Sequence, residues 1–330
     1  MVFVHSTGFR ALLRFVAIFW SINIILIAGY QKVFAQGAPI KIETELVSFE
    51  VSVFDQQGKP IQGLRENDFI LKVNGKERKI DFFAPLENTR SQRPLSMVFA
   101  IDVSGSITPN EVQKLQVALE RFIARFADYN SRFAVVTFGM RTKILQGFTN
   151  NPKKLRKSFT KIGREIDGLS THAYDAVDDA IRLIEKRSPK MIGEQIPRRI
   201  VLVISDGYPV GDVVSPKLVI ERANRAETSV YALILPSYSR LSGGNQPVIT
   251  LLEASNLIEK TGGKLYYAIG EDFDPLFFEL ANEIIASYAI AFYPDEDSKA
   301  EKRHLDVKIE TKENYLTRQN RSSVDLSRDH

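Results

Sequence analysis

The sequence predicts an α/β domain with a doubly wound, mostly parallel sheet of Rossmann-like type, flanked by antiparallel β-strands that form a small β-sandwich. Two observations support this fold class. Between residues 95 and 287, apolar strand-like runs alternate with amphipathic helical runs, which is typical of β-α units. Residues 40–85 and 288–330 instead contain strand patterns in which apolar and polar residues alternate.

Residues 1–35 have the features of a signal peptide. Arg10 and Arg14 precede an apolar run over 15–29, and Val33-Phe34-Ala35 places small residues where a signal peptidase cleaves. We therefore expect an exported protein, periplasmic or secreted. The alternative is a retained anchor in the inner membrane, although a run of about fifteen residues is short for a full span. In either case we expect the bulk of the chain to lie outside the cytoplasm.

Residues 40–85 are predicted to form an N-terminal β-strand unit. Apolar residues alternate from Val47 to Val53 and again from Phe69 to Val73, and the second run leads into Asn74-Gly75, a strong hairpin signal. The polar stretch 87–94 is predicted to be a linker.

The α/β domain is predicted over 95–287. Its strands are expected at 95–101, 132–138, 142–148, 199–205, 230–235 and 265–268. Its helices are expected to begin at Thr108-Pro109 and Asn151-Pro152, to span 173–187, to begin at Ser215-Pro216, and to span 250–260 and 274–286.

Residues 288–330 are predicted to contain two C-terminal strands, 288–293 and 305–309, followed by a frayed polar tail from Asn314. If these strands pack with residues 40–85, the α/β domain is inserted into one β-sandwich, and we favour this interpretation. Two separate small β appendages are the alternative.

Charge and cysteine content exclude several function classes. The net charge is +4, of which residues 1–35 contribute +3 through Arg10, Arg14 and Lys32, so the remainder carries about +1 (4 − 3). Nothing in this balance indicates a nucleic-acid partner. The chain has no cysteine, which excludes disulfides, thiolate nucleophiles and cysteine metal sites.

Polar residues follow three of the predicted elements. Asp102, Ser104 and Ser106 lie on the loop after the first strand, Thr171 precedes the helix at 173, and Asp206 ends the strand at 205. In a parallel sheet these three loops gather at one edge. A donor set of carboxylate and hydroxyl oxygens suits Mg²⁺, Mn²⁺ or Ca²⁺ rather than zinc.

These motifs resemble the metal-ion-dependent adhesion site of the von Willebrand factor A (VWA) family, over residues 95–287. The resemblance is carried by the DVSGS sequence at 102–106, Thr171 before the YDA helix, and the Asp206-Gly207 turn. The flanking segments also resemble those of exported bacterial VWA-related proteins. The sequence differs mildly from the family at Leu169-Ser170, where a glycine pair is common.

The resemblance implies a role for each candidate ligand. Ser104 and Ser106 would bind the ion directly, Thr171 would bind it in the ligand-competent state, and Asp102 and Asp206 would act mainly through bound water. One coordination position would remain for an Asp or Glu carboxylate of a protein partner.

Other polar residues are expected to have ordinary structural roles. His172 is interpreted as a rim or packing residue rather than a ligand. Asp272 and Glu283, near the last helix, are expected to be surface charges, and the basic helix face formed by Lys153, Lys154, Arg156 and Lys157 is expected to be solvated.

The leading function hypothesis is a non-enzymatic binding module that captures an acidic residue of a protein partner through the ion. A metal-stabilised structural or assembly protein of the cell envelope is the first alternative. A Mg²⁺-dependent phosphatase resembling the haloacid dehalogenases is the second, but position 104 is serine where that chemistry needs a second aspartate.

Overall fold

The computed structural model describes residues 46–85, 93–105, 108–163, 170–193, 195–235, 249–268, 272–285, 287–294 and 304–326. The expected signal peptide and most of the expected linker lie outside these residues. All the elements below belong to one compact unit, residues 45–330. In the part of the chain that is described, no helix is both long enough and apolar enough to cross a membrane.

A six-stranded sheet forms the centre of the α/β domain, in the order β10-β9-β8-β5-β6-β7. Neighbouring strands are parallel except β7, which pairs with β6 in antiparallel fashion at the edge. The strands are β5 (Leu95–Asp102), β6 (Arg132–Phe138), β7 (Lys143–Thr149), β8 (Arg198–Ser205), β9 (Thr228–Ile234) and β10 (Leu265–Tyr267).

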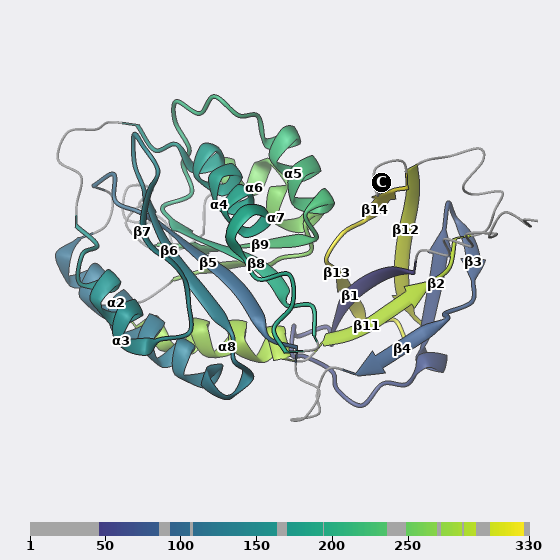
Figure 1. Ribbon diagram of the computed structural model, residues 1–330. Coiled ribbons are helices and arrows are strands. Elements are labelled where there is room, and N and C mark those ends of the chain that lie inside the picture. Colours follow the sequence, from purple (N-terminus) through teal and green to yellow (C-terminus); the bar gives the residue numbers. More distant parts are fainter. Residues whose placement is uncertain are drawn as a thin grey trace, which may run out of the picture. The chain divides into compact units, whose positions relative to one another are not determined.

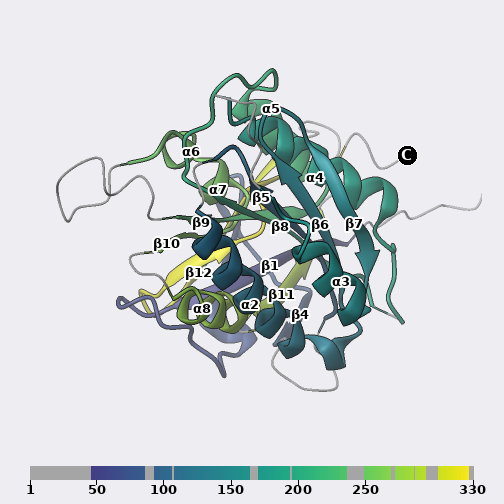
Figure 2. The same ribbon diagram turned by 90° about the vertical axis from the view of Figure 1, so that its left-hand side faces the viewer.

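Helices cover both faces of this sheet (Figure 1). One face packs against α2 (Pro109–Arg125), α3 (Pro152–Phe159) and α8 (Asp274–Ile285), and the other packs against α4 (Ala173–Arg187), α5 (Pro216–Arg225), α6 (Leu251–Ala254) and α7 (Leu257–Lys260). The central strand β5 is buried along its whole length. Its alternate residues enter the two cores, with Phe99 in one and Ala100 in the other. The predicted fold class is confirmed, and Figure 2 shows the domain from the side.

Local sequence explains where the helices begin. Thr108 caps α2 with a capping box, in which its hydroxyl accepts from the Glu111 backbone N–H and the Glu111 carboxylate accepts from the Thr108 N–H. The expectation of a single helix at 250–260 is wrong, because the helix is interrupted between α6 and α7. Asn256 adopts a left-handed conformation (φ 56°) there, which asparagine tolerates better than most residues.

Two four-stranded antiparallel sheets form the β-sandwich, in the orders β13-β1-β11-β4 and β14-β12-β2-β3. The strands are β1 (Val47–Phe54), β2 (Phe69–Val73), β3 (Lys76–Arg78), β4 (Phe82–Pro85), β11 (Ser287–Phe292), β12 (His304–Thr311), β13 (Leu316–Gln319) and β14 (Ser323–Asp325). Short 3-10 helices lie at η1 (Glu66–Asp68) and η2 (Ala127–Tyr129).

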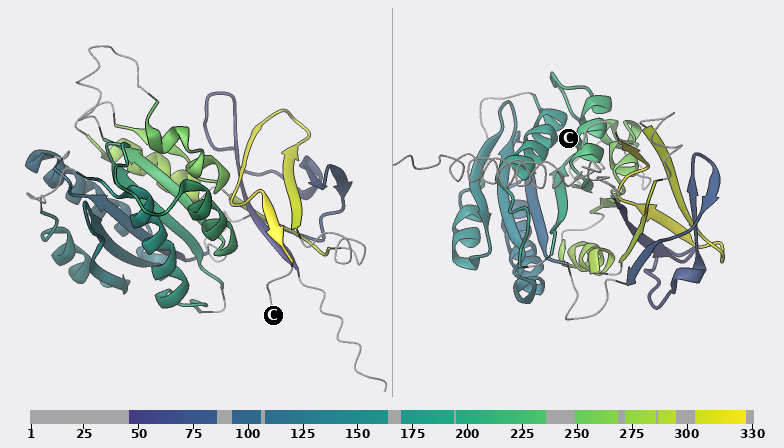
Figure 3. Two further views of the ribbon diagram at one scale, coloured as in Figure 1. Left: turned by 90° about the horizontal axis from the view of Figure 1, so that it is seen from above. Right: turned by 45° about the vertical axis from the view of Figure 1, so that its right-hand side comes forward.

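Both sheets combine strands from the two ends of the described chain, which alternate in the first sheet and meet at the β12–β2 pair in the second. In the first sheet Val51 of β1 lies opposite Tyr288 of β11, and in the second Leu71 of β2 lies opposite Ile309 of β12. Figure 3 shows these purple-blue and yellow strands side by side. The α/β domain is thus inserted between two halves of one sandwich, whose shared core includes Phe49, Tyr288 and Ile290.

The expectation of a frayed tail from residue 314 is wrong. Residues 316–319 and 323–325 form β13 and β14, and the Asn320 side chain accepts from the Glu50 backbone N–H at 3.0 Å. Backbone pairing with β1 and β12 orders this segment, so its polar composition does not reveal the strands. Residues 327–330 lie outside the described part.

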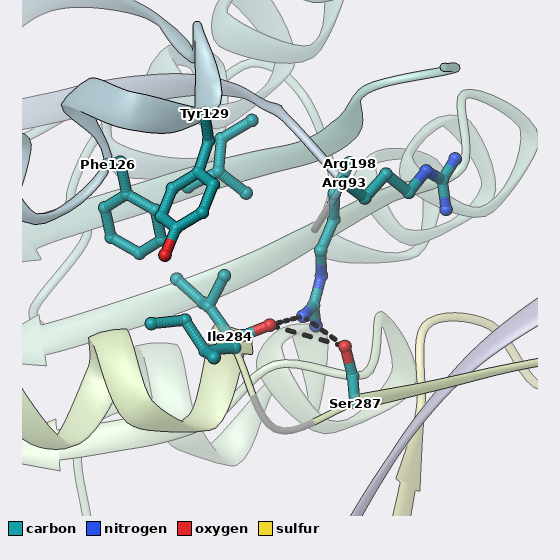
Figure 4. A pocket seen from close by; sticks show the side chains of 8 residues that line it. Arg93, Phe126, Tyr129, Arg198, Ile284 and Ser287 are labelled. Atoms are coloured by element: carbon teal, nitrogen blue, oxygen red, sulfur yellow. Dashed lines mark hydrogen bonds between the residues drawn. The ribbon is translucent and has the colours of Figure 1, made fainter. Parts of the chain in front are cut away.

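A buried polar cluster lies where β8 begins. Arg198, 5% exposed, donates to the Ile284 carbonyl at 2.9 Å and to Ser287 Oγ at 3.3 Å (Figure 4). Its Nε lies 2.6 Å from Oε2 of Glu50, and Arg93 contacts the other carboxylate oxygen of Glu50. Strand β1 of the sandwich and β8 of the α/β domain are therefore joined by a buried ion pair.

Glu283 belongs to the same region, and its expected role as a surface charge is wrong. This side chain is 1% exposed, and it accepts hydrogen bonds from Tyr266 Oη at 2.9 Å and from Arg318 at 2.8 Å. Position 283 falls on the buried face of α8, which the sequence pattern obscures because a carboxylate there resembles a solvated helix residue.

Candidate metal centre

Asp102 occupies the last position of β5 and is fully buried. Its two carboxylate oxygens have different partners. The Ser104 backbone N–H donates to Oδ1 at 2.8 Å, and the Ser205 hydroxyl donates to Oδ2 at 2.8 Å. Asp102 is thus held by its own loop on one side and by the end of β8 on the other.

Ser104 and Thr171 meet although 67 residues separate them in the chain. The Thr171 hydroxyl donates to Ser104 Oγ at 2.9 Å. Thr171 is fixed by a pair of backbone hydrogen bonds with Val210, at 3.2 and 2.9 Å, on the loop that follows β8. Three loops therefore converge at the carboxyl edge of the sheet.

Asp206 follows directly after β8. Its Oδ1 accepts from the Tyr208 backbone N–H at 3.1 Å and lies 3.4 Å from Ser205 Oγ. Gly207 has a φ of 85°, and a Cβ at this position would lie 2.8 Å from Cγ2 of Thr250. Only glycine allows the chain to turn here, and that turn leaves Asp206 beside the other candidate ligands.

The charged forms of Asp102 and Asp206 are both disfavoured by burial. Burial raises the pKa of Asp102, and hydrogen bonds from Ser104 and Ser205 offset this only in part, while the nearby Asp206 raises it further. Burial also raises the pKa of Asp206. Within the described ranges, no lysine or arginine forms an ion pair with either carboxylate. A bound cation would relieve both costs.

The donor chemistry fits a hard divalent ion. Two carboxylates and at least two hydroxyls, all oxygen, converge at this edge, as Mg²⁺, Mn²⁺ and Ca²⁺ prefer. The described residues hold no group of three or more His, Asp or Glu side chains that could bind a metal.

The structure brings together Asp102, Ser104, Thr171 and Asp206 of the predicted set. Ser106 lies outside the described residues, as does Leu169. The assignment of these five residues as ligands stays a prediction. Ser205 was missed by the sequence reasoning, although its place directly before Asp206, at the end of a central strand, is a usable signal.

His172 lies beside this group. Its Nδ1 is 3.2 Å from an Asp175 carboxylate oxygen, and a Cβ on Gly211 would lie 2.8 Å from its Nε2. The Asp175 carboxylate also accepts the backbone N–H groups of Val213 and Val214. These contacts hold the loop after β8 against the start of α4.

Comparisons with known proteins find one family model and several solved structures that are similar to this chain. Residues 97–208 match the model of the von Willebrand factor type A domain. No curated protein matches the chain. Among solved structures, proximal thread matrix protein 1 from the mussel byssus is similar at 18% identity with a TM-score of 0.48, covering 64% of this chain and 51% of that one. This chain thus spans about half the length of the mussel protein, which has also been solved with a zinc-occupied MIDAS motif.

Two bacterial structures are similar over most of their own length. The conserved hypothetical protein BatB from Bacteroides thetaiotaomicron has 16% identity and a TM-score of 0.43, covering 58% of this chain and 97% of that one. The vWF domain of the type V pili tip protein Mfa5 from Porphyromonas gingivalis has 11% identity and a TM-score of 0.44, covering 58% and 95%. The match over residues 97–208, together with the doubly wound sheet, identifies a von Willebrand factor type A domain within this chain.

Proposed function

We propose that this chain is an exported, non-enzymatic protein-binding module that captures an Asp or Glu of a protein partner through a divalent ion, Mg²⁺ or else Mn²⁺ or Ca²⁺. The ligands would be Asp102, Ser104, Ser106, Thr171 and Asp206. The observation that carries the proposal is the 2.9 Å contact between the Thr171 and Ser104 hydroxyls, beside the buried Asp102 carboxylate and the half-buried Asp206 carboxylate.

The electrostatics favour an acidic partner. The direct ligands would be the neutral hydroxyls of Ser104, Ser106 and Thr171, while Asp102 and Asp206 would act mainly through bound water. A dication held in this way would keep enough positive charge to attract a carboxylate from outside in a partly dry site. The protein's own residues would orient the ion, because Asp102 and Thr171 are each held by hydrogen bonds from separate elements.

Export is proposed from the basic-apolar-small pattern of residues 1–35. A retained anchor would keep the same α/β domain outside the cytoplasm. The charge balance indicates no nucleic-acid partner, and any membrane contact would come only through an uncleaved N-terminal segment.

Ion binding is tested by titrating Mg²⁺ into the metal-free protein, with calorimetry and thermal unfolding as readouts. We expect Mg²⁺ to raise the unfolding temperature of wild type, and Ser104→Ala to weaken Mg²⁺ binding by roughly tenfold or more. Asp306→Asn, which changes a carboxylate with an 81% exposed side chain on β12, is the matched control and should bind Mg²⁺ as wild type does. Equal Mg²⁺ affinity for wild type and Ser104→Ala would contradict the proposed site.

A second titration separates binding from a purely structural metal. If the ion keeps a coordination position for a partner, a carboxylate-bearing peptide should bind more tightly with Mg²⁺, and Mg²⁺ more tightly with the peptide, by the same factor. A fully enclosed ion would show no coupling. Phosphatase activity on generic phosphate esters with Mg²⁺ would favour the hydrolase alternative instead.

A further inference from the structure

Exposed apolar side chains gather around the candidate metal site. They lie on the segments that follow β6, β8 and β9, at the edge where the site residues converge. We call this set the apolar rim, and it comprises Met140, Val210, Val213, Ile249 and Leu251. Val213 and Ile249 are the most exposed, at 87% and 69%.

Backbone hydrogen bonds connect each rim segment to the site. The His172 N–H donates to the Gly139 carbonyl at 3.0 Å, which places Met140 next to the Thr171 loop. Val210 is paired directly with Thr171. On the other side, the Leu252 N–H donates to the Gly207 carbonyl at 3.1 Å, which brings the start of α6 beside Asp206.

The rim is presented by ordered backbone. Asp175 accepts the N–H groups that follow Asp212, at 3.1 Å from Val213 and 2.8 Å from Val214, so the loop carrying Val213 is fixed from below. Tyr174 donates to the Leu251 carbonyl at 3.0 Å and fixes the start of α6. Because this backbone is already fixed, little backbone freedom is lost when a partner covers the rim.

A single exposed valine or leucine needs no explanation, but a group of them around a polar centre does. A bound cation would attract any acidic side chain. It would therefore distinguish poorly between one acidic segment and another. Apolar side chains around that contact would be covered only by a partner with apolar residues next to its acid.

Resting on the proposed function, we propose that the site selects an extended protein segment in which the ion-binding Asp or Glu is flanked by large aliphatic or aromatic side chains. In an extended chain, alternate residues point the same way at about 6.6 Å spacing, so side chains two residues from the acid would face the same surface of the protein as the acid does. A bound dication would supply the charge complementarity, and the rim would supply the sequence preference.

The test is a selection of random linear peptides displayed on phage, captured on the full chain in Mg²⁺ and eluted with EDTA. We expect the eluted peptides to be enriched in Asp or Glu with Leu, Ile, Val or Phe two residues away. Synthetic versions of the selected peptides are then measured against variants of the rim.

The double variant Val213→Ser with Ile249→Ser should reduce affinity for the selected peptide roughly tenfold or more, because two apolar side chains no longer cover it. Its Mg²⁺ affinity should stay within about twofold of wild type, since neither side chain belongs to the ion site. The matched control is Met191→Ser with Ile196→Ser, which changes two exposed apolar residues on the segment before β8, and it should preserve both affinities.

The outcomes separate the two proposals. EDTA-eluted peptides that share an acid but no apolar neighbour, or rim variants that bind the peptide as wild type does, would overturn this inference and leave the proposed function intact. If Mg²⁺ binds but no peptide is released by EDTA, partner capture fails and this inference fails with it.

Discussion

Buried carboxylates lie at both ends of the central sheet, but only those at one end are paired with arginine. At the carboxyl end, Asp102 is fully buried, and among the described residues no arginine or lysine pairs with it. At the start of β8, Glu50 and Glu283 are also buried, but each contacts arginine: Arg198 and Arg93 for the first, Arg318 for the second. A buried acid that is paired with arginine contributes to the fold, whereas a buried acid without such a partner is a candidate ligand-binding group. We therefore call the region at the start of β8 the scaffold end, and the carboxyl end of the sheet, where the ion is proposed to bind, the ligand end.

The largest effect on the free energy of unfolding is expected from removing the arginine at the scaffold end. Arg198→Met removes a cation that is 5% exposed and leaves Glu50 with less compensation, so the free energy of unfolding should fall by about 3–5 kcal/mol. Urea denaturation measures it. Arg156→Met, which removes an exposed ion pair with Glu120, is the control and should cost at most about 1 kcal/mol. Similar losses for the two variants would remove the contrast between buried and exposed pairs.

A smaller effect, of opposite sign, is expected at the ligand end. Burial raises the pKa of Asp206, which means that its charged form is disfavoured in the folded protein. Asp206→Asn removes this charge, so the metal-free protein should become more stable at pH 7. The same change should weaken Mg²⁺ binding by about 100-fold, equivalent to about 2.7 kcal/mol. Thermal unfolding in EDTA and in excess Mg²⁺ measures both. A metal-free variant less stable than wild type would show that the carboxylate serves the fold rather than an ion.

The smallest effect is a pH dependence. Because the folded-state pKa values of Asp102 and Asp206 are raised above the ordinary 3.8, the folded state binds protons more tightly than the unfolded state. Without divalent ions, these two groups should therefore make wild type gain stability as pH falls from neutral toward the raised values, relative to Asp206→Asn. With saturating Mg²⁺ the trend should reverse, since protons compete with the ion. Parallel curves for the two proteins would argue against buried charge at this edge.

At the ligand end, the sequence predicts the convergence of the loops because the signals for it are local. A capping box at Thr108, a hairpin at Asn74-Gly75 and an Asp-Gly turn after an apolar strand each depend on a few adjacent residues. Parallel strand order then brings separate loops to one edge. The convergence of Asp102, Ser104, Thr171 and Asp206 follows from these features.

The scaffold end is less visible because its contacts join distant segments. Glu283 resembles a solvated helix residue until Arg318 and Tyr266 are placed against it. Residues 316–325 are polar and give no alternating apolar pattern, yet they pair with β1 and β12. The orientation of Ser205 toward Asp102 likewise depends on the register between β8 and β5, which the local sequence does not fix.

The insertion of the α/β domain also has a kinetic consequence. Strands β1 and β2 are made first, but their partners β11 and β12 follow only after more than 200 further residues. Neither half of the sandwich can bury its apolar face until the intervening domain has collapsed and brought residues 85 and 287 close together. During synthesis, the apolar stretch 47–54 is therefore an exposed, aggregation-prone strand that depends on a late partner.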